Sequence, residues 1–165
     1  MTDTALTDTT TVTVATDTAM RALGSAVAAE TRAGDLLILS GPLGAGKTTF
    51  TQGLGEGLGV RGPVTSPTFA IARTHPNLGG GPDLVHVDAY RLGGPDELDD
   101  LDLDLGMEEA VTVVEWGEGM AEWLSDDRLE IAIDRHADDT RTVRIRRVGA
   151  RWSTALAALS ADELE

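Results

Sequence analysis

The segment from residue 35 to residue 60 joins an apolar run, a glycine-rich turn and a helix-like stretch without interruption. DLLILS (35–40) is a short continuous apolar run, typical of a strand that is buried on both faces. GPLGAGKT (41–48) follows at once and fits the pattern G-x-x-x-x-G-K-[ST] in full. KTTFTQGLGEGLGV (47–60) then repeats apolar residues at helical spacing, although three glycines weaken it as a helix. The apolar residues of this stretch are Phe50, Leu54 and Leu58, and its glycines are Gly53, Gly55 and Gly57. We therefore expect a strand, a glycine loop and a helix in succession.

A glycine loop placed between a strand and a helix is typical of a phosphate-binding site. Glycines let successive backbone N–H groups turn inward around a phosphate, and the N-terminus of the helix adds partial positive charge. Lys47 would reach the β- and γ-phosphates of a nucleotide, and Thr48 would place its hydroxyl on Mg²⁺. The predicted nucleotide-binding residues of this segment are Gly44, Ala45, Gly46, Lys47, Thr48 and Thr49. The loop alone does not distinguish nucleotide binding from turnover.

Lys47 is the only lysine of the chain, because the other 12 of its 13 basic residues are arginines. The chain uses arginine almost everywhere else for positive charge, so a lysine at this position suggests a role that arginine does not fill. Its ammonium is a compact point charge on a thin, flexible stem, whereas a guanidinium is wide and planar. This difference favours Lys47 as the phosphate-reaching cation.

Two further apolar runs each end in a carboxylate. Asp88 ends the strand-like segment LVHVD, and Glu115 ends VTVVE. If these strands are parallel neighbours, both carboxylates emerge at the carboxyl edge of the sheet, where the glycine loop also lies. Asp88 has the position of a Walker B acid that holds the magnesium shell, and Glu115 would bind magnesium or orient the attacking water. The predicted catalytic residues are thus Lys47, Asp88 and Glu115, and the predicted metal contacts are Thr48, Asp88 and Glu115.

The segment TSPTF (65–69) follows the first glycine-loop helix, where nucleotide-binding proteins often sense the γ-phosphate. A hydroxyl from Ser66 or Thr68 would serve as such a switch. A proline turn with a capping serine explains the same residues equally well.

The remaining segments indicate an α/β domain. Residues 1–10 are expected to form a flexible tail and 11–16 an edge strand, followed by a helix that Asp17 caps and Gly34 stops. Two alternating segments, 128–135 and 141–148, are typical of an antiparallel hairpin, and a C-terminal amphipathic helix follows. We predict one domain over 11–165, with a three-layer P-loop NTPase fold and a mainly parallel sheet that carries an antiparallel extension. The segment 94–109 would be a short helix and loop, and its acidic run 96–104 would be a solvated face or a docking site for a partner.

Composition narrows the function classes. Acidic residues outnumber basic ones by 28 to 13, which gives a net charge of −15 and disfavours unaided binding to nucleic acid or anionic membranes. There is no cysteine, so disulfides, thiolate nucleophiles and cysteine-ligated metals are excluded. The N-terminus lacks the features of a secretory signal, and we expect a cytoplasmic protein. The three histidines show no ligand spacing and are interpreted as structural: His75, His86 and His136.

Together these motifs resemble the TsaE family, also called YjeE, the small ATPases of bacterial threonylcarbamoyladenosine synthesis on tRNA. The matching pieces are GPLGAGKTTF, SPTF, HVDAYRL and VEWGE, in the family's order, and the resemblance covers about residues 12–148. It implies ATP and Mg²⁺ at the glycine loop, Thr48 and Glu115 as metal contacts, Asp88 as the Walker B acid, and a contact between adenine and the turn at Asp17. It also implies that the protein acts on a complex of TsaB and TsaD, which itself holds the tRNA, to support multiple turnover.

Two other functions remain open at this point. A small-molecule P-loop kinase would share the size and the sheet, but it should carry a lid with several arginines near the phosphates. The arginines at 141, 144, 146 and 147 lie on a late alternating strand, which fits a lid poorly. A GTP-binding switch needs an N-K-x-D element, and a chain whose only lysine is Lys47 does not have one.

Overall fold

The computed structural model describes residues 7–42, 44–62, 64, 72–88, 107–115, 127–149 and 152. The described residues form one seven-stranded sheet with the strand order β1-β7-β6-β2-β5-β4-β3. The strands are β1 (Thr7–Val14), β2 (Leu36–Ser40), β3 (Ala72–His75), β4 (Asp83–Asp88), β5 (Ala110–Glu115), β6 (Arg128–Arg135) and β7 (Arg141–Val148). The helices are α1 (Asp17–Glu30), α2 (Lys47–Leu58) and the short 3-10 helix η3 (Met107–Glu109).

The centre of the sheet is parallel and its two margins are antiparallel. Strand β2 pairs in parallel with β5 and with β6, and β5 pairs in parallel with β4. Strands β7 and β1 extend the sheet on one side, and β3 extends it on the other, all by antiparallel pairing. The prediction of a mainly parallel sheet with an antiparallel extension is confirmed. The hairpin of β6 and β7 is also confirmed, and β6 joins the parallel centre as well.

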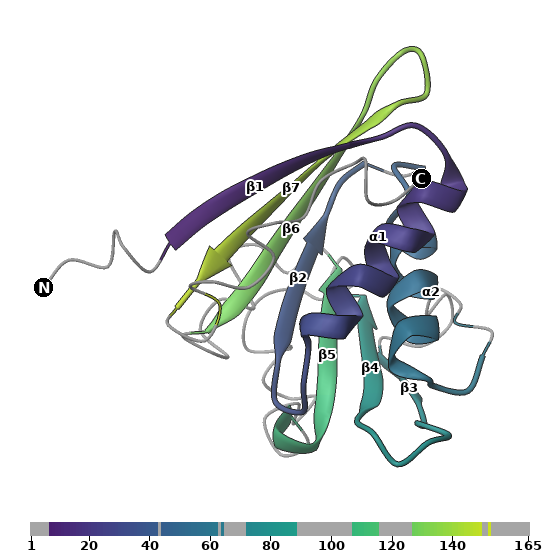
Figure 1. The fold of residues 1–165 in the computed structure, drawn as a ribbon, viewed down its shortest axis with the longest axis vertical. Helices are drawn as coiled ribbons and strands as arrows, with labels where there is room; N and C mark the ends of the chain where they lie inside the picture. Colours follow the sequence, from purple (N-terminus) through teal and green to yellow (C-terminus); the bar gives the residue numbers. More distant parts are fainter. Residues whose placement is uncertain are drawn as a thin grey trace, which may run out of the picture.

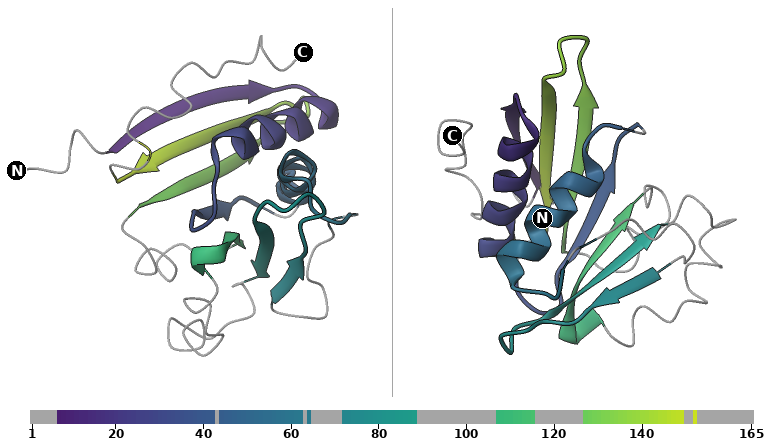
Figure 2. Two further views of the ribbon diagram at one scale, coloured as in Figure 1. Left: turned by 60° about the horizontal axis from the view of Figure 1, so that its bottom comes forward. Right: turned by 90° about the vertical axis from the view of Figure 1, so that its right-hand side faces the viewer.

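Helices α1 and α2 lie side by side on one face of the sheet (Figure 1), and both views in Figure 2 show the same arrangement. The apolar core lies between them and the sheet. Its central residues are Leu37 and Leu39 of β2, Val111 and Val113 of β5, and Phe50 and Leu54 of α2, all buried. Of the three predicted layers, the described residues supply the sheet and one helical layer.

The glycines of the two helices allow an unusually close approach. A methyl group built on Gly53 would lie 2.0 Å from the carbonyl oxygen of Arg21 in α1. A methyl group on Gly24 of α1 would lie 2.2 Å from the carbonyl oxygen of Phe50. Only hydrogen fits at such distances, so these glycines let the helix backbones touch. From the sequence we interpreted the glycines of α2 only as a weakness, and the structure adds the contact that requires Gly53.

Element boundaries differ from expectation in three places. Strand β1 begins at Thr7, so residues 7–10, assigned to the tail, belong to the edge strand. The N-cap of α1 is Thr16, whose side chain accepts a hydrogen bond from the N–H of Ala19, and Asp17 is the first helical residue. Because Asp17 lies inside the first turn, its carboxylate adds charge at the helix N-terminus rather than a cap. The helix ends at Glu30, before Gly34.

Several predictions fall outside the described residues. These are the switch residues Ser66 and Thr68, the acidic run 96–104 and the C-terminal helix, of which only Trp152 is described. Trp152 is fully buried in the core. Within the described ranges, no helix is both long and apolar enough to cross a membrane.

Gly53→Ala tests the helix contact. Alanine in a helix is ordinarily more favourable than glycine by about 1 kcal/mol. Here the added methyl group would meet backbone atoms, so we expect the free energy of unfolding to fall by about 1–3 kcal/mol, as overpacked sites do. Urea denaturation measures the change. Gly62→Ala is the control, because its methyl group would have no neighbour closer than 3.9 Å. A Gly53→Ala protein as stable as the wild type would contradict the close packing.

Candidate active site

The glycine loop joins the end of β2 to the start of α2. Gly44 has φ of 82° and Gly46 has φ of 113°, both in the left-handed region that favours glycine. Gly46 is also the N-cap of α2, and no side chain caps the first turn of this helix. The N–H groups of that turn therefore keep donor capacity for an anion, as a phosphate loop requires. Leu43 lies outside the described residues.

Lys47, the first residue of α2, places its ammonium inside this loop. Its Nζ donates a hydrogen bond to the carbonyl oxygen of Gly41 at 2.5 Å, and the residue is only 7% exposed. Burial lowers the pKa of Lys47 from its ordinary value, and the nearby charges of Glu115 and Asp88 oppose that shift. The lone lysine is thus a buried cation held close to two carboxylates.

Those two carboxylates are brought together by the parallel pairing of β4 and β5. Asp88 and Glu115 are register partners at the ends of the two strands. Glu115 is also the partner of Leu39, one residue before the end of β2, so the carboxylates share an edge with the glycine loop. The structure thus brings together three residues that were predicted to share one edge of the sheet: Lys47, Asp88 and Glu115.

His86 belongs to this cluster, although the sequence analysis interpreted it as structural. Its side chain is fully buried, and its Nε2 is bonded to Oε2 of Glu115. His86 precedes Asp88 by two residues on β4, so both side chains lie on the same face of the sheet. That spacing in HVD was the available signal, but only the pairing of β4 with β5 identifies Glu115 as the partner.

Other predicted residues border the loop. Thr48 and Thr49 occupy the first turn of α2 and are partly buried. Asp17 starts α1, whose first turn reaches the loop through Met20: the Cε atom lies 3.2 Å from the position of a methyl group built on Gly46. The Asp17 carboxylate is 79% exposed and lies 3.9 Å from the guanidinium of Arg141.

The sequence analysis missed a second residue at the loop, Arg135. Its guanidinium lies 3.5 Å from the position of a methyl group built on Gly44. It also donates two hydrogen bonds to Oδ1 of Asp139, at 2.6 and 3.1 Å. The signal was its position at the end of a strand that pairs in parallel with β2, but this pairing is not readable from the local sequence.

These residues fit a magnesium nucleotide. The left-handed glycines leave room for a phosphate where a side chain would stand, and the buried ammonium supplies a matching charge. Among the described residues, no three His, Asp or Glu side chains gather as a metal site. Mg²⁺ at a phosphate loop does not need such a group, because a hydroxyl, one or two carboxylates, phosphates and waters fill its shell.

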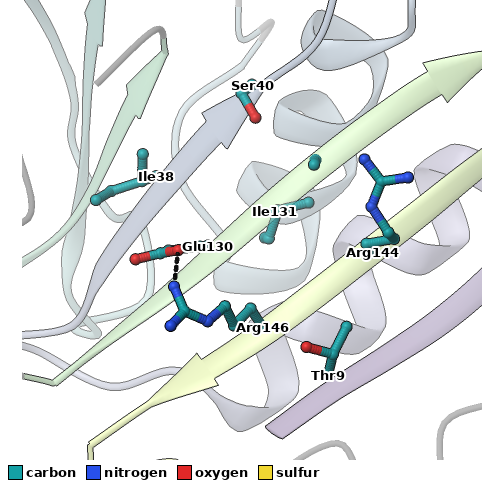
Figure 3. A pocket seen from close by; sticks show the side chains of 8 residues that line it. Thr9, Ile38, Ser40, Glu130, Ile131, Arg144 and Arg146 are labelled. Carbon is teal, nitrogen blue, oxygen red and sulfur yellow. Dashed lines mark hydrogen bonds and ion pairs between the residues drawn. The ribbon is translucent and has the colours of Figure 1, made fainter. Parts of the chain in front are cut away.

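A separate hollow of about 230 Å³ lies over β6, β7 and β2 (Figure 3). Arg146 reaches across it and donates to Glu130 at 2.9 Å. None of the predicted site residues lines this hollow. Its arginines, Arg144 and Arg146, are each paired with a carboxylate. The chemistry-bearing residues therefore lie at the loop and not in this hollow.

Comparison with known proteins gives a consistent result. The family model described as threonylcarbamoyl adenosine biosynthesis protein TsaE matches residues 14–143. The TsaE protein of Streptomyces coelicolor is 63% identical over 141 residues, which cover 82% of this chain and 95% of that protein. The TsaE protein of Bacillus subtilis is 43% identical over 141 residues, covering 85% and 87%. The crystal structure of Bacillus subtilis YdiB matches with a TM-score of 0.72 at 33% identity, covering 96% of this chain and 95% of that one.

The buried ammonium predicts a particular dependence of stability on pH. Because the pKa of Lys47 is lower in the folded protein than its ordinary value of 10.5, the unfolded chain binds the proton more tightly between those two values. The free energy of unfolding of the wild type should therefore rise with pH through that window and level off above it. Lys47→Met should lack this rise.

The amino-acid composition simplifies this measurement, because few other groups change charge in the same pH range. Lys47 is the only lysine, there is no cysteine, and Tyr90 is the only tyrosine, so few other side chains titrate at alkaline pH. Urea denaturation should be run from pH 8 to about 11 in wild type and Lys47→Met, each in a Tyr90→Phe background. Protein labelled with ¹³C-lysine gives a single Cε signal that reports the pKa directly. A pKa at or above the ordinary value would contradict the prediction.

Proposed function

The chain belongs to the TsaE family of tRNA threonylcarbamoyladenosine biosynthesis, and from that premise we propose that it binds ATP with Mg²⁺ at the glycine loop and hydrolyses it. One observation carries the proposal. A phosphate-type loop, a buried ammonium and two carboxylates from neighbouring strands meet at one edge of the sheet. Burying a charged group costs free energy. A glycine loop with a purely structural role would therefore not be expected to contain a buried ammonium close to two carboxylates.

Each residue has a role in this proposal. The backbone N–H groups of Gly44 and Gly46 and the ammonium of Lys47 bind the phosphates, while the N–H of Ala45 donates to the carbonyl oxygen of Pro42 within the loop. Thr48 and Thr49 lie in the first turn of α2, and Thr48 is the proposed metal contact. Asp88 and Glu115 hold the metal with its waters, and one of them orients the attacking water. When bound, Mg²⁺ neutralises charge on the phosphate oxygens.

The proposal extends to partners. We propose that hydrolysis acts on a complex of TsaB and TsaD and supports repeated rounds of tRNA modification, with tRNA contacted only through that complex. The net charge of −15 supports this division, because such a surface repels a polyanion unless other proteins hold it. Ser66 and Thr68 are the proposed switch that couples the nucleotide to the partners. Because tRNA is the final substrate, we place the protein in the cytoplasm.

A small-molecule kinase is the alternative. Family membership favours the accessory ATPase. Rapid phosphorylation of a metabolite by the isolated protein would support the kinase instead.

Removing either carboxylate should separate turnover from binding. We expect Asp88→Asn and Glu115→Gln to lower the ATPase rate by about 100-fold or more, because both remove the charge that organises metal and water. Binding of ADP without metal should stay within a few-fold of wild type in both variants. Lys47→Met is the reference that loses nucleotide binding. Glu108→Gln, an exposed residue on η3, is the control that should keep wild-type activity. Full turnover in both carboxylate variants would contradict the assignment.

Reconstitution tests the partner proposal. Purified protein is combined with TsaB, TsaD and tRNA, and modified tRNA is counted per complex over time. We expect the wild type to sustain many rounds with ATP, and Glu115→Ala to stop after about one. A second expectation is that the ATPase rate, weak for the isolated protein, rises when TsaB and TsaD are added. Sustained rounds with Glu115→Ala would show that hydrolysis here is not required.

A further inference from the structure

Within the part of the chain that the structure describes, His86 is a fully buried titratable side chain that is bonded to a proposed catalytic carboxylate. Its Nε2 is paired with Oε2 of Glu115, and the two residues come from neighbouring parallel strands. Glu115 itself is 6% exposed, so the pair is almost entirely shielded from water. A hydrogen bond in such surroundings holds its partners firmly, because no solvent competes for them.

The hydrogen bond also indicates which ring nitrogen carries the proton. The Nδ1 atom of His86 is buried and has no hydrogen-bond partner among the described residues. A proton on Nε2 alone gives Glu115 a donor and leaves only an unpaired acceptor at Nδ1. The arrangement thus favours the tautomer in which Nε2 donates to the carboxylate.

Glu115 also interacts with a nearby positive charge. The ammonium of Lys47 lies close enough to interact with the charges of both Glu115 and Asp88. A glutamate with free torsions would be drawn to that ammonium, and a closed ion pair would occupy both the phosphate-binding cation and the metal-binding carboxylate. The hydrogen bond from His86 holds Oε2 of Glu115 near β4 and therefore disfavours this ion pair.

We propose that His86 is a positioning residue that fixes the Glu115 carboxylate for its role at the metal or the attacking water. The proposal rests on the proposed function for the role of Glu115. Imidazole partners that orient metal-binding groups in this way typically change metal affinity or activity by about 10–100-fold when removed.

The chain offers a matched control in His75. This histidine lies on β3, next to β4, and is 5% exposed. Its Nε2 has no hydrogen-bond partner in the described part of the chain, and it is not bonded to Glu115. Burial lowers the pKa of His75, so this residue is a second buried imidazole close to β4. Replacing it removes the same chemical group without touching the carboxylate.

The test compares His86→Leu, His86→Gln and His75→Leu. In His86→Leu we expect the ATPase rate to fall about 10–100-fold and the Mg²⁺ concentration for half-maximal ADP binding to rise, with metal-free ADP affinity unchanged. His86→Gln, whose amide N–H reaches a similar position to Nε2, should recover most of the loss. His75→Leu should leave rate and Mg²⁺ dependence within about two-fold of wild type. Unfolding in urea shows which variants remain folded.

A second measurement does not depend on activity. The imidazole N–H of His86 should give a downfield proton resonance in ¹⁵N-histidine-labelled wild type, because its bond shields it from exchange with water. The resonance should disappear in Glu115→Ala and persist in His75→Leu. A resonance unchanged in Glu115→Ala would overturn the pairing.

The outcomes separate this inference from the proposed function. If the wild type neither hydrolyses ATP nor binds ADP more tightly with Mg²⁺, the proposed function fails, and the positioning role that rests on it fails with it. If the wild type does both and His86→Leu matches it, only the positioning role is overturned. Equal losses in folded His86→Leu and His75→Leu, without rescue in His86→Gln, would assign His86 to the core and also overturn the inference.

Discussion

The parallel hydrogen bonding of β2, β5 and β4 is the constraint on which the rest of this structure depends. Parallel strands end at the same edge, so three segments far apart in the sequence deliver their last residues to one place. Strand β2 delivers the glycine loop, β5 delivers Glu115 and β4 delivers Asp88. The functional groups therefore need no loop of special shape beyond the glycine turn, because the register of the sheet positions them.

This edge concentrates charge that the fold must keep in balance. The ammonium of Lys47 is buried, and Asp88 and Glu115 favour its charged form while burial opposes it. His86 gives Glu115 a partner other than that ammonium. A buried ammonium with a shifted pKa beside two carboxylates is typical of functional sites. It agrees with membership in a family that acts in tRNA modification.

The helical layer supports the site by close packing. Gly24 and Gly53 bring the backbones of α1 and α2 into contact, and the first turn of α1 reaches the glycine loop through Met20. A small displacement of either helix would move Lys47, because this residue begins α2. Glycines that lower helix propensity thus bring together the two helices that border the glycine loop.

The sequence by itself determined the glycine loop, the two strands that end in the proposed carboxylates and the hairpin of β6 and β7. These features follow from local patterns: apolar periodicity, glycine spacing and carboxylates at strand ends. Ser66 and Thr68 stay predictions, since they lie outside the described residues.

Only the tertiary structure decided the strand order, the bond between His86 and Glu115, the place of Arg135 beside the loop and the backbone contact at Gly53. Each of these joins residues that are distant in the chain, and His86 and Glu115 are 29 residues apart. Local periodicity says which face a side chain occupies, but strand pairing and helix packing choose its neighbour. For that reason the sequence did not reveal the specific contacts that His86 and Gly53 make in the folded protein.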